Sequence, residues 1–221
     1  MMKQSLQANL SLLTEEQLPE IIALQEKVVA VLEKPEFLQP LTEEDYLYIL
    51  KGNGLIAGAY VDDKLIAFRA MLDPGKDDEH LGIDAGLPTE ELTSVLYSEI
   101  TGVDPAFRGN GLQTILGKWL MEHVDTERYR YICTTVAPLN IPSLKDKFAL
   151  GLQVAALKVK YGNKLRYILF KDLEASVQTE AKQEQRLLMS DTEKQRQVLA
   201  DGWIGQRIEK RDADWYVVYV K

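Results

Sequence analysis

Two glycines, Gly109 and Gly111, stand where a strand-like run turns into an amphipathic helix. The run covers residues 94–103, and the helix carries apolar residues at the spacing of one buried face: Leu112, Ile115, Leu116, Trp119, Leu120 and Val124. The first N–H groups of a helix have no intrahelical partner, and the helix dipole points its positive end outward there. Because glycine has no Cβ atom, an anion can approach that backbone closely. The junction therefore predicts an anion site of the kind that holds a pyrophosphate.

Two common nucleotide-binding motifs do not fit this junction. No Lys-Ser or Lys-Thr pair follows Gly111, as a Walker loop requires. No third glycine stands at the offset of the dinucleotide fingerprint. The simpler alternative is an ordinary glycine turn that opens a helix. A strand, Val103-x-Pro105, Arg108-Gly109-x-Gly111 and an amphipathic helix in direct succession favour ligand binding over that alternative.

The stretch from Val103 to Gln113 resembles the acetyl-CoA loop of the GNAT acetyltransferase family. That loop usually reads Gln/Arg-x-x-Gly-x-Gly/Ala, and here Arg108 and Gly111 match while Gln113 departs at the last position. The backbone N–H of Gln113 can still donate if its side chain turns away from the phosphates. The resemblance implies acetyl-CoA as co-substrate and these binding residues: Thr101, Val103, Arg108, Gly109, Asn110, Gly111, Leu112 and Gln113.

A second segment, residues 136–152, resembles the strand end, Asn-x-x-Ser/Ala helix start and terminal glycine of the same family. Asn140 and Ser143 occupy its two polar positions, and Gly151 follows the expected helix. Either side chain alone is explained by capping, since both satisfy N–H groups at a helix start. In the family, groups at this place contact the pantetheine arm. The resemblance therefore adds Asn140 and Ser143 to the cofactor-binding residues.

The pattern of elements predicts an α/β (α+β) protein with a mixed central sheet flanked by helices. We expect strands over 8–13, 55–61, 64–71, 94–103, 129–136, 153–160 and 165–170, and helices after 14, over 42–50, after 112 and over 140–150. Residues 73–93 are expected to form a loop with a short helix at 89–92. This order matches the GNAT order over about residues 5–173. The end of this stretch, 161–173, is similar to the last strands of a bacterial GNAT branch whose members are mostly uncharacterised.

We divide the chain into a GNAT acetyltransferase domain, 1–173, and a C-terminal extension, 174–221. The extension is expected to hold a helix over 192–200, capped by Ser190 or Asp191, and a β-hairpin over 203–220. An isolated hairpin is marginal in water. We therefore expect this one to pack on the domain, on a partner subunit or over the acceptor site, in that order of preference.

Glu99 is the only ionisable side chain in the middle of the central strand, and it is our candidate for the general base. By the two-residue period of a strand, Glu99, Thr101 and Val103 share one face while Ser98, Ile100 and Gly102 share the other. The alternative is a glutamate at a sheet margin that faces solvent or an arginine. The family often has a tyrosine acid seven residues after the asparagine, where this chain has Lys147. Tyr46, Tyr97, Tyr161 or solvent could take that role, so the acid is left unassigned.

These residues leave two functions open. One is an N-acetyltransferase that moves an acetyl group from acetyl-CoA to an amine of a small molecule or peptide by direct attack in a ternary complex. The other is a catalytically weak CoA-binding sensor or interaction module. The residue at 147 favours the second slightly, whereas Glu99 and the pair Asn140 and Ser143 favour the first.

The formal net charge of -8 argues against a nucleic-acid partner, whose affinity comes largely from Lys and Arg. It is compatible with a cationic acceptor, although solubility alone accounts for it more simply. We expect no membrane segment, no signal peptide in the first ten residues, and hence a cytoplasmic monomer or homodimer. Two distant histidines and one cysteine, Cys133, predict no metal site and no intrachain disulfide. Cys133 lies in a strand-like run and is expected to be a buried thiol.

Overall fold

A computed structural model describes residues 6–32, 38–175 and 183–221. The expectation that the first ten residues are no signal peptide therefore rests in part on residues outside the described ranges. The chain divides into two compact units. The first comprises Met1–Asp73 and Ser98–Asp125, and the second comprises Pro74–Tyr97 and Thr126–Lys221. Strand β4 (Val95–Val103) begins in the second unit and continues in the first. Each unit is described below by itself.

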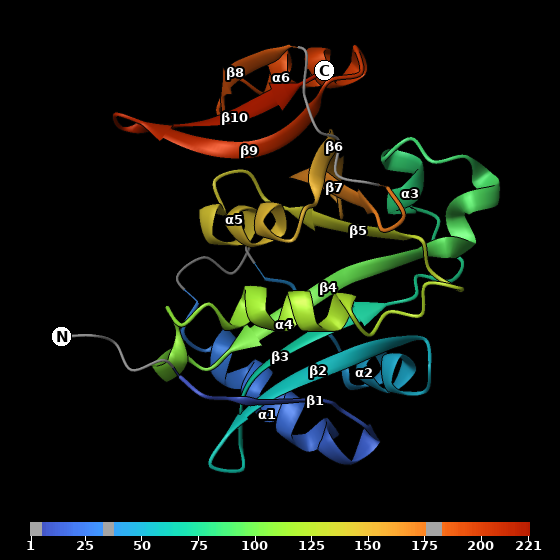
Figure 1. Cartoon of the computed structure of the whole chain (residues 1–221), viewed down its shortest axis with the longest axis vertical. Coiled ribbons are helices and arrows are strands. Elements are labelled where there is room, and N and C mark those ends of the chain that lie inside the picture. The colour runs from blue at the N-terminus through green and yellow to red at the C-terminus, as the bar shows by residue number, and fades with distance from the viewer. Residues whose placement is uncertain (1–5, 33–37, 176–182) are drawn as a thin grey trace. The chain divides into compact units, whose positions relative to one another are not determined.

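The first unit contains four neighbouring strands in the order β1-β2-β3-β4 (Figure 1). Strand β1 (Asn9–Leu12) pairs antiparallel with β2 (Gly54–Val61), which pairs antiparallel with β3 (Lys64–Leu72). The β2–β3 turn is Asp62-Asp63, and both residues have positive φ angles, 49° and 59°. A two-residue turn of this kind matches the twist of a hairpin, and aspartate tolerates the conformation better than most residues. The predicted hairpin is therefore confirmed.

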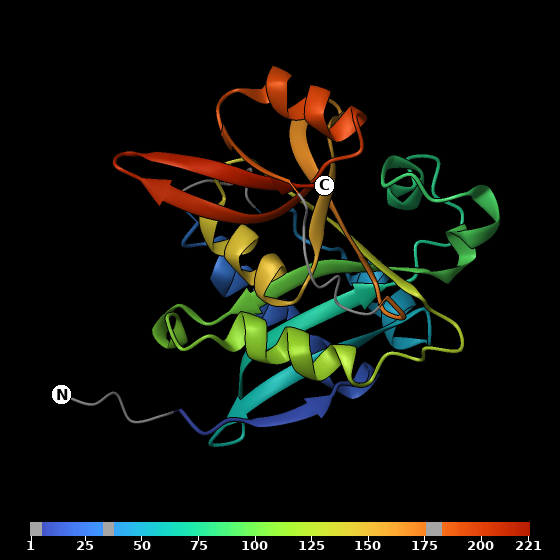
Figure 2. The ribbon, with the colours of Figure 1, turned by 45° about the horizontal axis from the view of Figure 1, so that its top comes forward.

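Two helices cover one face of these strands and a third covers the other (Figures 1 and 2). A 3-10 turn (Glu15–Gln17) leads into α1 (Leu18–Val29), and α2 (Glu43–Leu50) follows; Thr14 and Thr42 close capping boxes at these two starts. Helix α4 (Leu112–Met121) lies on the opposite face. The core beneath α1 and α2 consists of Leu13, Leu18, Ile21, Leu24, Val28, Tyr46, Ile49, Ile56, Leu65, Phe68, Ala70 and Ile100.

The buried face of helix α4 is narrower than the sequence predicted. On α4, Leu112, Leu116 and Leu120 are buried at a spacing of four, and Val124 is buried just beyond the helix. Ile115 is 45% exposed, because it falls at the edge of this stripe. A helix that packs on a sheet with one side needs only a narrow apolar seam, so flanking apolar residues can remain in solvent.

The second unit continues the strand order from the start of β4 through β5, β7, β6, β9 and β10 to β8. The strands are β5 (Tyr131–Val136), β6 (Gln153–Lys160), β7 (Lys164–Asp172), β8 (Glu184–Leu188), β9 (Ile204–Arg211) and β10 (Asp214–Val220). β4 pairs parallel with β5 only through Val95–Tyr97, opposite Tyr131–Cys133. All other recorded pairings are antiparallel. The sheet is therefore mixed, as the sequence predicted.

The helices of the second unit are α3 (Leu81–Asp84), a 3-10 helix (Thr89–Ser94), α5 (Ile141–Ala149) and α6 (Thr192–Ala200). α6 has the predicted bounds, and of the two predicted capping residues Asp191 is the one used. The sequence analysis did not predict α3 or β8. α3 is a single turn inside a polar loop, and β8 lies in a charged segment that lacks the alternation of a half-buried strand.

The C-terminal hairpin belongs to the second unit and carries part of its core. Val154 of β6 pairs with Gly205 of β9, and Val217, Val218 and Tyr219 of β10 are buried. The Tyr219 hydroxyl donates to Oε1 of Gln195 on α6 at 2.8 Å, and the Tyr167 hydroxyl donates to the same atom at 2.7 Å. One buried glutamine therefore ties α6 to β10 and β7. Within the described ranges, no helix is long and apolar enough to cross a membrane.

Candidate active site

The loop between β4 and α4 joins a strand to a helix, as the sequence predicted, and its two glycines have positive φ angles. A 3-10 turn (Pro105–Phe107) follows Asp104, and the loop then passes through Gly109 and Gly111 at φ angles of 78° and 72°. The Asn110 side-chain amide donates to the Phe107 carbonyl oxygen at 2.9 Å, which closes the turn. Gly111 is the N-cap residue of α4. Left-handed backbone at these two places explains why the chain has glycine there.

The start of α4 faces open space. A Cβ atom at Gly111 would meet no atom of the described residues within 4 Å, apart from its two chain neighbours. The first backbone hydrogen bond of the helix runs from the Ile115 N–H to the Gly111 carbonyl oxygen at 3.0 Å. The N–H groups of Leu112 and Gln113 precede that bond, at the positive end of the helix dipole. Arg108, Gly109 and Gly111 are exposed beside them. The predicted anion site is thus accessible within the first unit.

Asp104, the residue that precedes this loop, is a buried carboxylate held by two lysines. Its Oδ1 accepts from the Ala106 N–H at 3.0 Å, and its Oδ2 accepts from Lys27 Nζ at 2.8 Å, with Lys64 Nζ at 3.5 Å. Burial alone would raise the pKa of Asp104, but the hydrogen bond from Lys27 and the other partners hold that pKa below its usual value. The sequence analysis did not identify Asp104 as a site residue.

A pocket of about 340 Å³ opens next to this carboxylate, and none of Glu99 or the loop residues 108–113 lines it. It is lined by Glu20, Ala23, Leu24, Lys27, Asp63, Lys64, Leu65 and Asp104. The side chains of the two lysines are accessible to solvent, with Lys27 47% and Lys64 62% exposed. The Asp104 side chain is 0% exposed.

Arg69 of β3 is fully buried and reaches the first turn of α4. Its Nη1 donates to the Gln113 carbonyl oxygen at 3.0 Å, and its Nη2 donates to Ser98 Oγ at 2.9 Å. The sequence analysis missed this residue. From the sequence alone, an arginine among apolar strand residues can have its side chain buried or in solvent, and no neighbouring residue indicates which.

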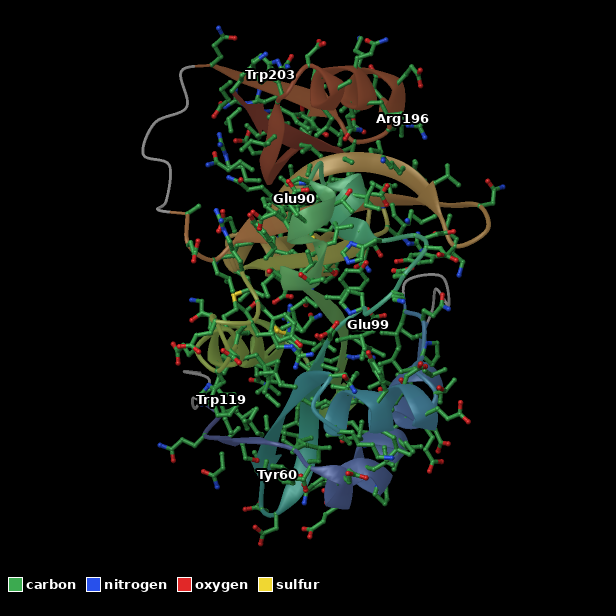
Figure 3. The ribbon with its side chains drawn as sticks, turned by 90° about the vertical axis from the view of Figure 1, so that its right-hand side faces the viewer. Tyr60, Glu90, Glu99, Trp119, Arg196 and Trp203 are labelled. Carbon is green, nitrogen blue, oxygen red and sulfur yellow. The ribbon has the colours of Figure 1, made fainter. Side chains whose placement is uncertain are left out.

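Glu99 lies on β4 and is exposed, whereas Thr101 and Val103 are half-buried. Its carboxylate adds to the burial that raises the pKa of Tyr46 on α2, with burial the larger cause. Figure 3 likewise places Glu99 on the side of β4 that carries α1 and α2, and Trp119 of α4 on the other side. Glu99 therefore points to the face of the first unit that is opposite α4.

The predicted face of Ser98 is wrong. Phe68 and Arg69 are consecutive in a regular part of β3 and so point to opposite faces. A Cβ atom at Gly102 would lie 2.5 Å from the Phe68 ring, whereas Ser98 hydrogen-bonds to Arg69. Ser98 and Gly102 consequently face opposite sides, and the two-residue alternation of β4 is interrupted between them. Glu99 lies on the same side as Ile100 and Gly102, so its predicted grouping with Thr101 and Val103 is wrong as well.

In the second unit, Asn140 is the N-cap residue of α5, and its Oδ1 accepts from the Ser143 N–H at 3.3 Å. Both residues are half-buried. Lys147 is buried on the same helix, with its Nζ 3.2 Å from Asp146 Oδ2. A charged pair with little solvent exposure thus occupies the place where the sequence comparison expected a tyrosine. The observed contact of the Asn140 side chain is thus the one expected of a helix-capping residue.

No known protein-family model matches the sequence, and neither does any curated protein. Solved structures do match. The ribosomal-protein-S18-alanine N-acetyltransferase of Escherichia coli is 14% identical, with a TM-score of 0.57 over 79% of this chain and 99% of that one. A GNAT-family acetyltransferase of Streptococcus pneumoniae is 15% identical, with a TM-score of 0.57 over 75% and 99%. The yncA protein of Salmonella typhimurium, assigned as an acetyltransferase and solved with its cofactor acetyl-CoA, is 14% identical, with a TM-score of 0.55 over 80% and 99%.

The chain has the GNAT acetyltransferase fold. The expected fold class, a mixed sheet flanked by helices, is therefore confirmed. These neighbours are acetyltransferases, and one of them binds acetyl-CoA. The match covers 99% of each of these three neighbours, so it is not confined to a fragment of them.

On this GNAT fold, two of the tyrosines considered as acids are committed to other contacts. The Tyr46 hydroxyl is buried and donates to Gln25 Oε1 at 2.7 Å. The Tyr97 hydroxyl is buried, accepts from the Leu81 N–H at 2.7 Å and donates to Asp77 at 3.1 Å. Burial raises the pKa of both phenols, which makes each a weaker acid. Tyr161 is 45% exposed, in the turn between β6 and β7.

Side chains suited to a metal do not gather within the described part of the GNAT fold of this protein. Among the residues that the structure describes, no three His, Cys, Asp or Glu side chains are placed to hold a metal ion together. Cys133 is buried in β5, and burial raises the pKa of its thiol to about 12. A thiol with that pKa is almost entirely protonated near neutral pH, so Cys133 is a poor nucleophile.

Proposed function

We propose that this protein is an acetyl-CoA-dependent N-acetyltransferase whose loop between β4 and α4 binds the pyrophosphate of the co-substrate. One observation carries the proposal: Gly109 and Gly111 adopt left-handed backbone at the exposed N-terminus of α4. Open space above Gly111 leaves room for an anion against the backbone. The fold shared with acetyltransferases supports the same function.

The proposed reaction needs few protein groups. The amine nitrogen attacks the thioester carbonyl carbon, a C–N bond forms, the C–S bond breaks, and the CoA thiolate leaves. Before the attack, Glu99 takes one proton of the acceptor ammonium, directly or through water, and the second proton that the nitrogen loses after the attack passes to water. A backbone N–H stabilises the developing oxyanion. Tyr46 and Tyr97 are buried in other hydrogen bonds, so solvent or the exposed Tyr161 protonates the thiolate.

The remaining site residues are assigned to the co-substrate. From the resemblance to the GNAT family, we take these to be Thr101, Val103, Arg108, Gly109, Asn110, Gly111, Leu112, Gln113, Asn140 and Ser143. The backbone of Gly109 to Gln113 holds the phosphates. Thr101 and Val103 offer strand backbone to the pantetheine arm, and Asn140 and Ser143 contact that arm. In this assignment Asn140 keeps its capping contact with the Ser143 N–H.

The acceptor is a primary amine of a small molecule or peptide. The net charge of -8 favours a cationic acceptor over a nucleic acid. We place the protein in the cytoplasm of a bacterium, as a monomer or homodimer. Residues 1–173 form the catalytic domain in this proposal, and residues 174–221 form an extension packed on it or on a partner subunit.

One observation favours a second function, a CoA-binding sensor with weak turnover. Lys147 is buried beside Asp146, where the family often has a tyrosine that protonates the leaving thiolate. A site without that acid still binds CoA but releases the thiolate slowly. Both functions need the same loop, so turnover alone separates them.

Two measurements test the proposal in order. Isothermal titration calorimetry with acetyl-CoA should give a Kd in the micromolar range, at about -8 kcal/mol. Release of the CoA thiol should then be followed with a thiol reagent over a panel of amines, amino acids and peptides. Acceptor-dependent release supports the enzyme, and binding without release supports the sensor. No binding at millimolar acetyl-CoA would reject both.

A further inference from the structure

The carboxylate of Asp104 lies where three elements of the first unit meet. Lys27 comes from α1, Lys64 begins β3, and Asp104 itself follows β4. We call Lys27 and Lys64, the two cations that pair with Asp104, the lysine clamp. The Asp104 N–H also donates to the Ile66 carbonyl oxygen at 2.8 Å, so both its backbone and its side chain are fixed.

The clamp is connected to the glycine loop through a single short turn. Asp104 Oδ1 accepts from the Ala106 N–H, and the Phe107 N–H donates to the Asp104 carbonyl oxygen at 2.8 Å. Phe107 in turn accepts from the Asn110 side chain, between the two glycines. A rotation of Asp104 would therefore displace the residues that hold Gly109 and Gly111 in position.

Burial makes this arrangement depend on charge. A carboxylate without solvent exposure is costly unless cations compensate for it, and Lys27 is the nearer of the two. If Lys27 loses its charge, Asp104 retains only the more distant Lys64 within the clamp. We expect its side chain to turn toward the water of the adjacent pocket, and the hydrogen bond to Ala106 to be lost.

We propose that Asp104 is a positioning residue, which the lysine clamp holds in place so that the glycine loop keeps its anion-binding conformation. This rests on the proposed function only in naming CoA as the anion. The conformation of the loop is a property of the protein alone and can be measured without the ligand.

The second unit contains a matched pair for the control. Asp84 is also held by two lysines, with Lys158 Nζ at 2.7 Å and Lys160 Nζ at 2.8 Å. Lys158 is 48% exposed and Lys27 is 47% exposed, so their charges are equally accessible to solvent. Asp84 ends α3 and holds no part of the glycine loop. Lys158→Met therefore removes a lysine–aspartate ion pair of similar lysine exposure away from the loop, and Asp84 keeps Lys160 at 2.8 Å.

The experiment compares Lys27→Met, Lys27→Arg and Lys158→Met in the full chain. Methionine keeps the apolar stem and removes the charge, whereas arginine restores the charge. Hydrogen–deuterium exchange of residues 105–111 without ligand should rise in Lys27→Met and stay at the wild-type level in the other two. The Kd for acetyl-CoA should rise by about tenfold in Lys27→Met alone, which corresponds to about 1.4 kcal/mol.

Two outcomes of the exchange measurement would overturn the proposal, and so would one outcome of the binding measurement. One is unchanged loop exchange in Lys27→Met, and the other is equal loop exchange in Lys27→Met and Lys158→Met, which would make the effect one of general stability. If the wild type binds no CoA, the proposed function fails, but the exchange measurement still decides whether the clamp orders the loop. If CoA binds and loop exchange rises without a change in Kd, the clamp does not serve the binding site and the proposal is wrong.

Discussion

The guanidinium of Arg69 donates a hydrogen bond to the Gln113 carbonyl oxygen at 3.0 Å, so a buried cation of β3 touches the first turn of α4. Gln113 is one of the residues assigned to the phosphates of acetyl-CoA. The charge of Arg69 adds to the positive end of the helix dipole, at the place where an anion would bind. Because this part of the protein excludes water from Arg69, its field is screened less than that of a surface arginine. The loop thus combines exposed N–H groups with a covered positive charge.

Gly111→Ala should weaken acetyl-CoA binding by tenfold or more. A Cβ atom at this position meets open space, so the fold survives, but the methyl group occupies the approach to the backbone. The left-handed φ angle of 72° adds a strain of about 1–2 kcal/mol. Calorimetry measures the affinity, and thermal unfolding measures the strain.

Gly202→Ala provides the control for Gly111→Ala. Gly202 has a φ angle of 82°, and a Cβ atom there also meets nothing within 4 Å, but Gly202 lies after α6 in the second unit. Both variants should lose similar stability, and only Gly111→Ala should lose affinity. Equal affinities in the two variants would show that the N-terminus of α4 is not the anion site.

Glu99→Gln should lower kcat by about 10²-fold or more at neutral pH, the usual contribution of a general base. The amide cannot accept the ammonium proton, so the remaining rate should rise more steeply with pH as the free amine forms in solution. Glu122→Gln, an exposed glutamate beyond α4, is the control and should leave the rate unchanged. If kcat and the pH profile of Glu99→Gln match the wild type, the base lies elsewhere or is not needed.

Local patterns predicted most of the elements that form the loop and its surroundings. The sequence predicted helices after residue 14 and from residue 42, and the structure has capping boxes at Thr14 and Thr42; Gly109 and Gly111 marked the start of α4. These signals depend on residues within one turn of each other, so they can be read in a single sequence. Where two elements meet far apart in the chain, such signals are absent.

The unpredicted parts of the site are all long-range contacts. Lys27 and Asp104 are 77 residues apart, and Arg69 and Gln113 are 44 apart, so no local pattern connects them. The interrupted alternation near Ser98 was missed for a similar reason, because only the neighbouring strand reveals it. Glu99 could be selected as the candidate base from its position in the strand, but the side chains around it could be identified only from the structure.

Native Cys133 should not react with thiol reagents at pH 8. Its pKa of about 12 leaves roughly one thiol in 10⁴ ionised at that pH, and the side chain is buried. Because the folded state holds the proton more tightly than the unfolded state, this group favours folding fully below about pH 9 and loses that effect as the pH rises toward 12. Rapid modification of one thiol per native chain, followed by absorbance, would contradict the burial. Modification should become complete in denaturant.

Gln195→Leu should lower the free energy of unfolding by about 2 kcal/mol or more. It removes the acceptor of the Tyr167 and Tyr219 hydroxyls and the donor to the Met189 carbonyl oxygen, all at buried positions. Gln197→Leu changes an exposed residue of the same helix and should stay within about 0.5 kcal/mol. Adding Tyr167→Phe and Tyr219→Phe to Gln195→Leu should recover part of the loss, because no hydroxyl is then left unsatisfied. Urea unfolding gives all three values, and a loss no larger than that of Gln197→Leu would refute the network.

Deletion of residues 203–221 should lower stability and solubility while changing acetyl-CoA affinity less. The deletion removes β9 and β10, whose Val217, Val218 and Tyr219 are buried, and it leaves β8 without its recorded partner strand. Gly205 would no longer pair with Val154, so β6 would present an open apolar edge, which promotes aggregation. The glycine loop belongs to the other unit and keeps its own contacts. Truncation after residue 173 removes α6 as well and should be more severe, since it also uncovers Tyr167.

A soluble, equally stable truncated protein would show that the tail is an independent appendage. A stable protein that binds acetyl-CoA but acetylates no acceptor would instead assign the hairpin to the acceptor site.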